Sequence, residues 1–201
     1  MAQAVFEKIY TENAWGKGSG DGSTPEATIE YRAFLTKFLA DHKDDIKTIA
    51  DIGSGDWQFS RLMDWSNHDY TGYDCVATLV ETNNRTFAGS NVRFRHLDIL
   101  TEELPMVYDL IILKDVLQHW TNGAIVRTLT RLQKKAKYIL VTNCADQARY
   151  TCQDTPLGGM RALSSSMVPL ILFDAKPLIT FGRKESSLIC GTPPDQPIEP
   201  K

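Results

Sequence analysis

The feature of this sequence that most constrains its fold is an alternation of short apolar runs with segments of helical spacing between residues 48 and 142. An apolar run of about four to eight residues suits a buried strand, whereas apolar residues that recur every three or four positions suit one face of a helix. Such alternation is typical of stacked βαβ units with parallel strands. The first segments of the pattern are Thr48 to Ile52, Phe59 to Trp65, Tyr70 to Tyr73, Val76 to Phe87, and Val92 to His96.

Two further apolar runs fit the centre of a parallel sheet. The run from Tyr108 to Leu113 is apolar on both strand faces, as expected of a strand that is covered on both sides. A helical pattern from Ala124 to Lys135 then leads to another buried run, Lys137 to Thr142. The sequence therefore predicts an α/β fold with a mostly parallel sheet.

The N-terminal region, residues 1 to 45, is expected to form two helices joined by a mobile loop. Apolar residues recur at helical spacing from Val5 to Ile9, and four glycines between Gly16 and Gly22 then interrupt the pattern. The second helix is expected to begin near Ser23 to Pro25, where capping side chains precede a proline, and to continue to about His42.

The C-terminal region departs from the βαβ pattern. Two apolar runs, Leu178 to Phe181 and Ser187 to Cys190, predict a closing antiparallel hairpin. The tail, residues 193 to 201, is rich in proline and is expected to be disordered. A chain of 201 residues suffices for one α/β domain but not for two of ordinary size, so residues 1 to 192 are expected to form a single domain.

Composition and charge exclude several classes of protein. Apolar residues make up 42% of the chain and charged residues 23%, close to globular averages, which excludes a disordered, collagenous or disulfide-knotted chain. The 22 Lys and Arg residues against 25 Asp and Glu residues give a net charge of −3, so there is no overall basic field for a nucleic acid. A nucleic-acid partner is therefore disfavoured.

The cysteines and apolar segments bear on metal binding and compartment. The four cysteines include no C-x-x-C pair, so no zinc or thioredoxin-like motif is present, and no metal is expected. The N-terminus lacks the apolar core of a signal peptide, and the longest uncharged apolar stretch, Met167 to Phe173, is too short for a membrane span. These features predict a soluble, cytoplasmic protein without a membrane partner.

The chemistry of this chain is indicated by residues 49 to 57, where an apolar strand passes Asp51 and opens directly into a glycine turn before a helix. Glycine permits the tight turn, and without a Cβ it lets a ligand approach the backbone N–H groups at the sheet edge. The next strand ends in Asp74, where doubly wound folds place a carboxylate on ribose, and Asp98 follows the third strand. Each acid alone could be an ordinary cap, but together they indicate one nucleoside.

Two residues favour a cationic nucleoside over a dinucleotide. The dinucleotide fingerprint requires a third glycine at the position of Gln58. Asp56 would repel a diphosphate at the start of the expected helix, whereas it would favour a cation. S-adenosylmethionine carries a sulfonium and an ammonium group and therefore fits better than a nicotinamide dinucleotide.

From about Phe6 to Thr192 the sequence resembles the class I S-adenosylmethionine-dependent methyltransferases. The matching motifs, in chain order, are Asp51-Ile-Gly-Ser-Gly55, Tyr73-Asp74, Leu97-Asp98-Ile99 and Tyr108-Asp-Leu-Ile-Ile-Leu-Lys-Asp115. The resemblance implies a Rossmann-like, doubly wound, seven-stranded sheet whose last strand is antiparallel, with S-adenosyl-L-methionine as cofactor and S-adenosyl-L-homocysteine as product. It also implies that the turn Gly53, Ser54 and Gly55 contacts the methionine part of the donor, Asp74 the ribose, and Asp98 with Ile99 the adenine. We expect Trp15, Asp51 and Lys114 to contact the donor as well.

A narrower resemblance concerns two segments, Lys114-Asp-Val-Leu-Gln-His119 and Gly158-Gly-Met-Arg161. They are similar to a bacterial-type group of small methyltransferases with an N-terminal glycine-serine loop, whose substrates are largely unassigned. The Pro-Pro-aromatic pattern of many adenine, cytosine and glutamine N-methyltransferases is missing after the fourth strand, where Lys114 and Asp115 stand instead. Those acceptors are therefore disfavoured.

Two residues after the fourth strand are candidates for catalysis. Methyl transfer from a sulfonium mainly requires alignment and exclusion of water, and a base is needed only if the acceptor loses a proton. His119 has the pKa best suited to that task, although it could instead simply pack beside Trp120. Asp115 is the second candidate, and it could equally orient Lys114 or bind acceptor amines.

Two segments are expected to cover the ligands. The Gly16 to Gly22 loop lacks the order of a phosphate-binding loop, and we expect a lid over the donor with Trp15 as its apolar anchor, the alternative being a solvated linker. The long segment from Asp146 to Ser166 is expected to form a second cover. Within it, Tyr150 and Arg161 are candidate acceptor contacts, Arg161 for a carboxylate or phosphate.

Several functions stay open at this point. The first is methylation of a small-molecule acceptor at oxygen or nitrogen, and the second is a donor-binding regulatory module without catalysis. Methylation of RNA or protein is disfavoured by the net charge of −3. A nicotinamide oxidoreductase is disfavoured by Gln58. The sequence identifies neither the acceptor nor the oligomeric state.

Overall fold

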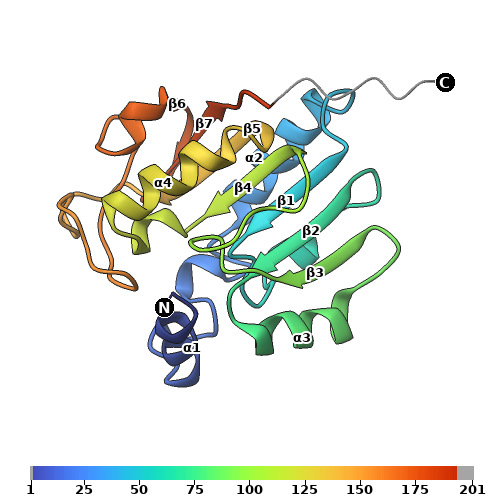
Figure 1. Cartoon of the computed structure of the whole chain (residues 1–201), viewed down its shortest axis with the longest axis horizontal. Coiled ribbons are helices and arrows are strands. Elements are labelled where there is room, and N and C mark those ends of the chain that lie inside the picture. Colours follow the sequence, from blue (N-terminus) through green and yellow to red (C-terminus); the bar gives the residue numbers. More distant parts are fainter. Residues whose placement is uncertain (1, 194–201) are drawn as a thin grey trace.

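The apolar runs form one seven-stranded sheet in the computed structural model, which describes residues 2–193 (Figure 1). The strands lie in the order β3-β2-β1-β4-β5-β7-β6. Their bounds are β1 Thr48–Ile52, β2 Asp69–Asp74, β3 Val92–His96, β4 Tyr108–Lys114, β5 Ala136–Cys144, β6 Lys176–Phe181 and β7 Lys184–Cys190. The predicted tail lies outside the described residues from position 194 onward.

The strand pairing confirms a mostly parallel sheet with a closing hairpin. Strands β1 to β5 pair in parallel, whereas β7 pairs antiparallel with both β5 and β6. Strand β1 lies between β2 and β4, so the strand order reverses there. Ligands of open α/β sheets bind at the carboxyl ends of the strands beside such a reversal.

Helices cover both faces of the sheet. The α-helices are α1 Ala2–Thr11, α2 Ile29–Asp41, α3 Ala77–Phe87 and α4 Asn122–Leu132, and short 3₁₀ turns span Asp21–Ser23, Ser60–Leu62, Leu117–His119 and Leu170–Phe173. Residues Ile111 and Leu113 of β4 pack in one core with α4, and Leu110 and Ile112 pack in the other with α2. The prediction that this strand is covered on both faces is confirmed.

Two expected helices differ from the structure. Phe59 to Trp65 forms only the short turn Ser60–Leu62, and Trp57, two positions before it, has a left-handed φ of 57°. The indole N–H groups of Trp57 and Trp65 bond to the Tyr70 hydroxyl and the Ser60 carbonyl, each at 2.8 Å, so buried aromatic residues fix this segment instead.

The second helix begins at Ile29 rather than near Pro25. Thr24 accepts a hydrogen bond from the Ala27 N–H at 3.3 Å, and the Thr28 hydroxyl donates to the Thr24 carbonyl at 2.8 Å. These local bonds stabilise a separate turn before the helix. Within residues 2–193, none of the helices combines the length and apolar character needed to cross a membrane.

Candidate active site

A cavity of about 660 Å³ lies along the carboxyl edge of the sheet, next to α1 and the glycine loop (residues 16–22). Its volume is in the range of about 300–1,000 Å³ that is usual for small-molecule sites. All the predicted catalytic, donor-binding and acceptor-binding residues line this cavity except Gly55 and Arg161. Those that line it are Trp15, Asp51, Gly53, Ser54, Asp74, Asp98, Ile99, Lys114, Asp115, His119 and Tyr150.

The turn after β1 forms the floor of the cavity. Gly53 has a φ of 73°, and a Cβ at this position would lie 2.6 Å from Val116 Cγ2. The Gly53 and Ser54 N–H groups both donate to the Tyr73 carbonyl, at 2.7 and 3.0 Å. The Gly55 N–H donates to Asp74 at 2.9 Å. The prediction that a ligand contacts these backbone N–H groups is therefore wrong, because all three already have protein partners. Glycine is needed at position 53 for the positive φ of the turn and for the close packing against Val116.

The Ser54 hydroxyl lines the same floor and is a free polar group. Its Oγ is buried and has no hydrogen-bond partner. A buried hydroxyl without a partner costs about 1–3 kcal/mol. A ligand with a donor or acceptor at this point of the cavity would remove that cost.

Two buried carboxylates face the cavity at the ends of β2 and β3. Asp74 Oδ1 accepts from the Val76 N–H and Oδ2 from the Gly55 N–H, both at 2.9 Å. Burial raises the pKa of Asp74, although these backbone bonds oppose the shift. Asp98 Oδ1 accepts from the Leu100 N–H at 3.1 Å. A carboxylate has about four acceptor sites, so both acids retain lone pairs for a ligand.

Asp51, in β1, is a third buried acid. Its Oδ2 accepts a 2.5 Å hydrogen bond from the Tyr70 hydroxyl, which itself accepts from the Trp57 indole. Burial raises the pKa of Asp51 to about 6, although the Tyr70 bond and the charge of Lys114 lower it. Ionisation of Asp51 therefore costs free energy in the folded protein, and a cationic ligand would stabilise the ionised form.

Asp115 is held by two lysines at the end of β4. Lys114 Nζ donates to Asp115 Oδ2 at 2.6 Å and to the Gly22 carbonyl at 3.0 Å, and Lys184 Nζ contacts the same carboxylate oxygen. Burial opposes ionisation, but the two ammonium groups lower the pKa of Asp115 to about 2. A carboxylate this acidic is a weak base, so the geometry fits the orienting role for Asp115.

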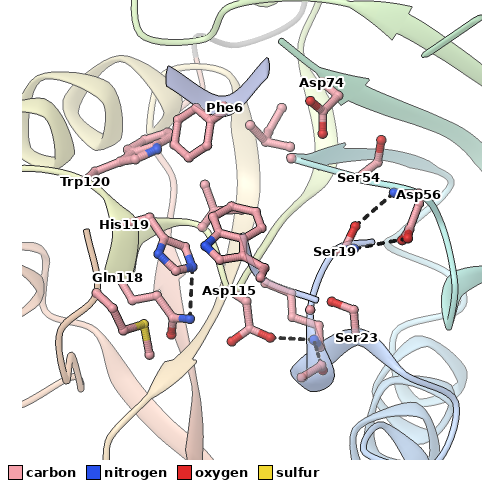
Figure 2. Close-up of a pocket in the computed structure, with 18 of the residues that line it drawn as sticks. Phe6, Ser19, Ser23, Ser54, Asp56, Asp74, Asp115, Gln118, His119 and Trp120 are labelled. Atoms are coloured by element: carbon pink, nitrogen blue, oxygen red, sulfur yellow. Dashed lines mark hydrogen bonds and ion pairs between the residues drawn. The ribbon is translucent and has the colours of Figure 1, made fainter. Parts of the chain in front are cut away.

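His119 lies across the cavity from Asp74 and Ser54 (Figure 2). Its Nδ1 lies 2.7 Å from the Gly159 carbonyl and therefore carries the proton. Its Nε2 lies 3.3 Å from Gln118 Nε2, and the Cys144 N–H donates to Gln118 Oε1, which orients the amide. Burial lowers the pKa of His119. The imidazole is therefore neutral near pH 7, with its Nε2 lone pair facing an amide N–H.

The glycine loop is attached to the β1 turn over the cavity. The Ser19 N–H donates to Asp56 Oδ2 at 3.1 Å, and the Asp56 N–H donates to Ser19 Oγ at 3.0 Å (Figure 2). Gln58 donates to the Lys17 carbonyl at 2.5 Å. Trp15 stacks on His119, with ring centroids 4.8 Å apart and an interplanar angle of 29°. These contacts hold the glycine loop and Trp15 against the cavity wall.

Substituting Gly18 with alanine is expected to loosen the glycine loop. A Cβ at Gly18 would lie 2.0 Å from Asp56 Oδ2, whereas one at Gly16 would meet nothing within 4 Å, although both glycines have positive φ. Gly16→Ala is therefore a control for backbone strain alone. Hydrogen exchange of residues 12–22 is expected to be about tenfold faster in Gly18→Ala than in Gly16→Ala, which corresponds to ~1.4 kcal/mol. Equal exchange would mean that the Ser19 and Asp56 contacts do not hold the loop.

The two predicted acceptor contacts separate in the structure. Tyr150 lines the cavity, whereas Arg161 is fully buried outside it and donates to Asn122 Oδ1 at 2.6 Å. Arg161 therefore ties the long segment before β6 to the start of α4 and does not face a ligand in the cavity.

Three cations at the cavity were not found from the sequence: Arg149, Arg183 and Lys184. Lys184 begins β7 and pairs with Cys144, the last residue of β5. An antiparallel strand begins at the edge of the sheet where its parallel neighbours end. The predicted hairpin therefore indicates that the first residue of its last strand lies at the cavity. Arg149 lies in an irregular segment and carries no comparable signal.

Comparisons with known proteins give a match in structure alone. No family model matches the sequence, and no curated protein matches it either. Solved structures do match. The DhpI complex with S-adenosylhomocysteine superposes with a TM-score of 0.66 at 11% identity, covering 96% of both chains.

Two further solved structures are of the same kind. Magnesium protoporphyrin IX methyltransferase from Synechocystis PCC 6803, with bound S-adenosylmethionine, gives a TM-score of 0.63 at 13% identity and covers 94% of this chain and 95% of that one. The N-methyltransferase NodS from Bradyrhizobium japonicum WM9 gives 0.58 at 12% identity, covering 83% and 98%. The chain therefore has the fold of the class I methyltransferases, as its motifs imply.

Proposed function

We propose that this protein transfers a methyl group from S-adenosylmethionine to an oxygen or nitrogen of a small-molecule acceptor. The observation that carries the proposal is the row of buried carboxylates along one side of the cavity, Asp51, Asp74 and Asp98. Burying a carboxylate without a cation is costly. A ligand with a sulfonium and an ammonium group offsets this cost.

The residues of the β1, β2 and β3 ends fit such a donor. Ser54 has a buried hydroxyl without a hydrogen-bond partner. Gly53 has no Cβ, which would otherwise collide with Val116 at the floor of the cavity. Asp74 and Asp98 accept hydrogen bonds from hydroxyl and amino groups through their remaining lone pairs. When bound, the donor supplies an activated methyl group that leaves sulfur by in-line displacement, and S-adenosylhomocysteine is the product.

The remaining lining residues align the acceptor and exclude water. The lid covers the cavity through Trp15 and through the Ser19 and Asp56 contacts. His119 is neutral near pH 7, so its Nε2 accepts the proton of a hydroxyl acceptor in place of the Gln118 hydrogen bond. We also propose a cytoplasmic location, in keeping with four cysteines that are all free thiols.

The test is donor-dependent methylation. The protein is incubated with methyl-labelled S-adenosylmethionine and fractions of a metabolite extract, and labelled product and S-adenosylhomocysteine are measured together. The matched variants are His119→Ala and His96→Ala, because His96 lies outside the cavity lining. Turnover that is lost in the first variant and kept in the second supports the proposal, and the absence of turnover with every fraction contradicts it.

The pH dependence of turnover reports the state of His119. Because burial lowers the pKa of His119 below its ordinary value of 6.5, the imidazole is mainly neutral at pH 6.5 and above. With a hydroxyl acceptor and saturating donor, kcat/KM for the acceptor is expected to be constant from pH 7 to 9 and to fall as the pH drops below the lowered pKa. An inflection above pH 7 would rule out His119 as the proton acceptor.

One observation favours a second candidate function, a donor-binding regulatory module without catalysis. Both nitrogens of His119 have hydrogen-bond partners, and Trp15 covers one face of its ring. Such a module would bind S-adenosylmethionine without turnover of any acceptor, and its function would be insensitive to His119→Ala.

A further inference from the structure

We infer that the acceptor carries a carboxylate or phosphate group, and that Lys184 and Arg149 bind this anion at the β5 and β7 end of the cavity. The inference deepens the proposed function and rests on it, because it specifies the substrate class of the same site. It follows from the distribution of charge along the edge of the sheet.

Acidic and basic residues dominate opposite ends of the cavity, with Lys114 and Asp115 at the end of β4 between them. The acids Asp51, Asp74 and Asp98 belong to β1, to β2 and to the segment just after β3. The cations Lys184 and Arg149 belong to β7 and to the segment after β5. In the order β3-β2-β1-β4-β5-β7-β6, the acids therefore occupy one end of the edge and these cations the other. A cationic donor and an anionic acceptor would each meet the opposite charge.

Lys184 contributes positive charge even though it is paired. Its ammonium contacts Asp115, but the same carboxylate oxygen also accepts from Lys114, so Lys184 does not have this carboxylate to itself. The Lys184 side chain is 17% exposed, which limits screening by water. Its charge also contributes to lowering the pKa of His119, so it acts on the side of the cavity where the acceptor would react.

Arg149 is the second cation and is available for a ligand. It takes part in none of the ion pairs found within residues 2–193, and its guanidinium lies 5.3 Å from the centre of the Tyr150 ring. The planar guanidinium binds carboxylates and phosphates through two parallel hydrogen bonds. Arg183 also lines the cavity, but it pairs with Asp146 at 3.4 Å, so we do not assign it to the anion.

The neighbouring residues indicate an acceptor with an apolar or aromatic body. Trp15, Trp120 and Met160 line the cavity. Trp15 stacks on His119, Trp120 follows His119 in the chain, and Met160 follows Gly159, whose carbonyl contacts His119. Figure 2 shows Trp120 and His119 on the side opposite Ser54 and Asp56. An anion held by Lys184 and Arg149 would orient the rest of a small acceptor along this apolar wall.

The test is a calorimetric titration of the protein saturated with S-adenosylhomocysteine. The probes are benzoate, phenyl phosphate, neutral benzamide and cationic benzylamine, which share one ring and differ in charge. At least one anion is expected to bind about tenfold or more tightly than benzamide and benzylamine. The benzoate and phenyl phosphate arms distinguish a carboxylate from a phosphate.

Three variants assign the binding. Arg149→Gln and Lys184→Gln are each expected to weaken anion binding about fivefold to tenfold. Arg127→Gln is the control, because Arg127 is exposed on α4 outside the cavity lining. Arg149 is also exposed, so its variant remains informative if Lys184→Gln fails to fold.

Three results would overturn the inference: no measurable anion binding, benzamide or benzylamine binding as tightly as the anions, or equal anion binding by Arg149→Gln and the wild type. Failure of the proposed function is seen separately, as failure of S-adenosylhomocysteine to bind. In that case the anion titrations of the protein without donor still report on Lys184 and Arg149.

Discussion

Replacing Gly53 with valine is expected to lower the affinity for S-adenosylhomocysteine by about 100-fold or more, or ~2.7 kcal/mol. The Gly53 Cβ position lies 2.6 Å from Val116 Cγ2, and the residue has a φ of 73° that disfavours a branched side chain. Valine would therefore displace the floor of the cavity at the point where we expect the donor to contact the turn. Calorimetry with S-adenosylhomocysteine measures the loss, and thermal unfolding reports whether the sheet persists.

Gly182→Val is the matched control for backbone strain. Gly182 also has a positive φ, of 54°, but its Cβ position meets nothing within 4 Å, and it lies in the turn between β6 and β7 outside the cavity lining. It is expected to lose stability while keeping donor affinity. Unchanged affinity in a folded Gly53→Val protein would mean that the donor binds elsewhere.

Replacing Asp51 with asparagine is expected to stabilise the protein without ligand and to weaken donor binding. Burial raises the pKa of Asp51 to about 6 from its ordinary value of 3.8. The folded protein then binds a proton more tightly than the unfolded chain, so the free energy of unfolding falls as pH rises through this window. Asparagine removes the cost, and the gain at pH 7.5 is expected to be about 1–3 kcal/mol.

Denaturant unfolding at pH 7.5 and at pH 4 measures the effect of this substitution. The gain is expected to vanish near pH 4, where Asp51 is protonated in the folded wild type. Asp109→Asn provides a contrast of opposite sign, because backbone N–H bonds and Lys137 lower the pKa of Asp109 in spite of its partial burial. Destabilisation by Asp51→Asn at pH 7.5 would contradict the account.

Donor affinity is expected to follow the same titration. The wild type is expected to bind S-adenosylmethionine more weakly at pH 5 than at pH 7.5, because a protonated Asp51 no longer attracts a cation. Asp51→Asn is expected to show the weaker affinity at both values. Equal affinity of the wild type at the two values would show that Asp51 does not act on the donor through its charge.

The strands and the acidic wall could be predicted because they depend on short stretches of sequence. The alternating faces of Tyr108 to Leu113 identify a strand that is covered on both sides, and the structure places Leu110 and Ile111 in opposite cores. Strand ends depend equally on local sequence, so the positions of Asp74 and Asp98 predict the sheet edge at which both residues line the cavity.

The parts that sequence could not predict depend on contacts between distant segments. Ser19 lies at the cavity because its hydroxyl bonds to Asp56, 37 positions away. Arg161 was expected to face an acceptor, but Asn122, 39 positions away, binds its guanidinium in the protein interior. The helix expected at Phe59 to Trp65 is missing because aromatic burial outweighs local helical spacing.

The acidic end of the cavity is expected to bind a cationic, sulfur-containing nucleoside. Calorimetric titration with S-adenosylmethionine and S-adenosylhomocysteine, with NADH as the control ligand, tests it most directly. We predict micromolar binding of the two sulfur ligands and no binding of NADH. Binding of NADH alone, or of none of the three, would contradict the assignment of this cavity to a methyl donor.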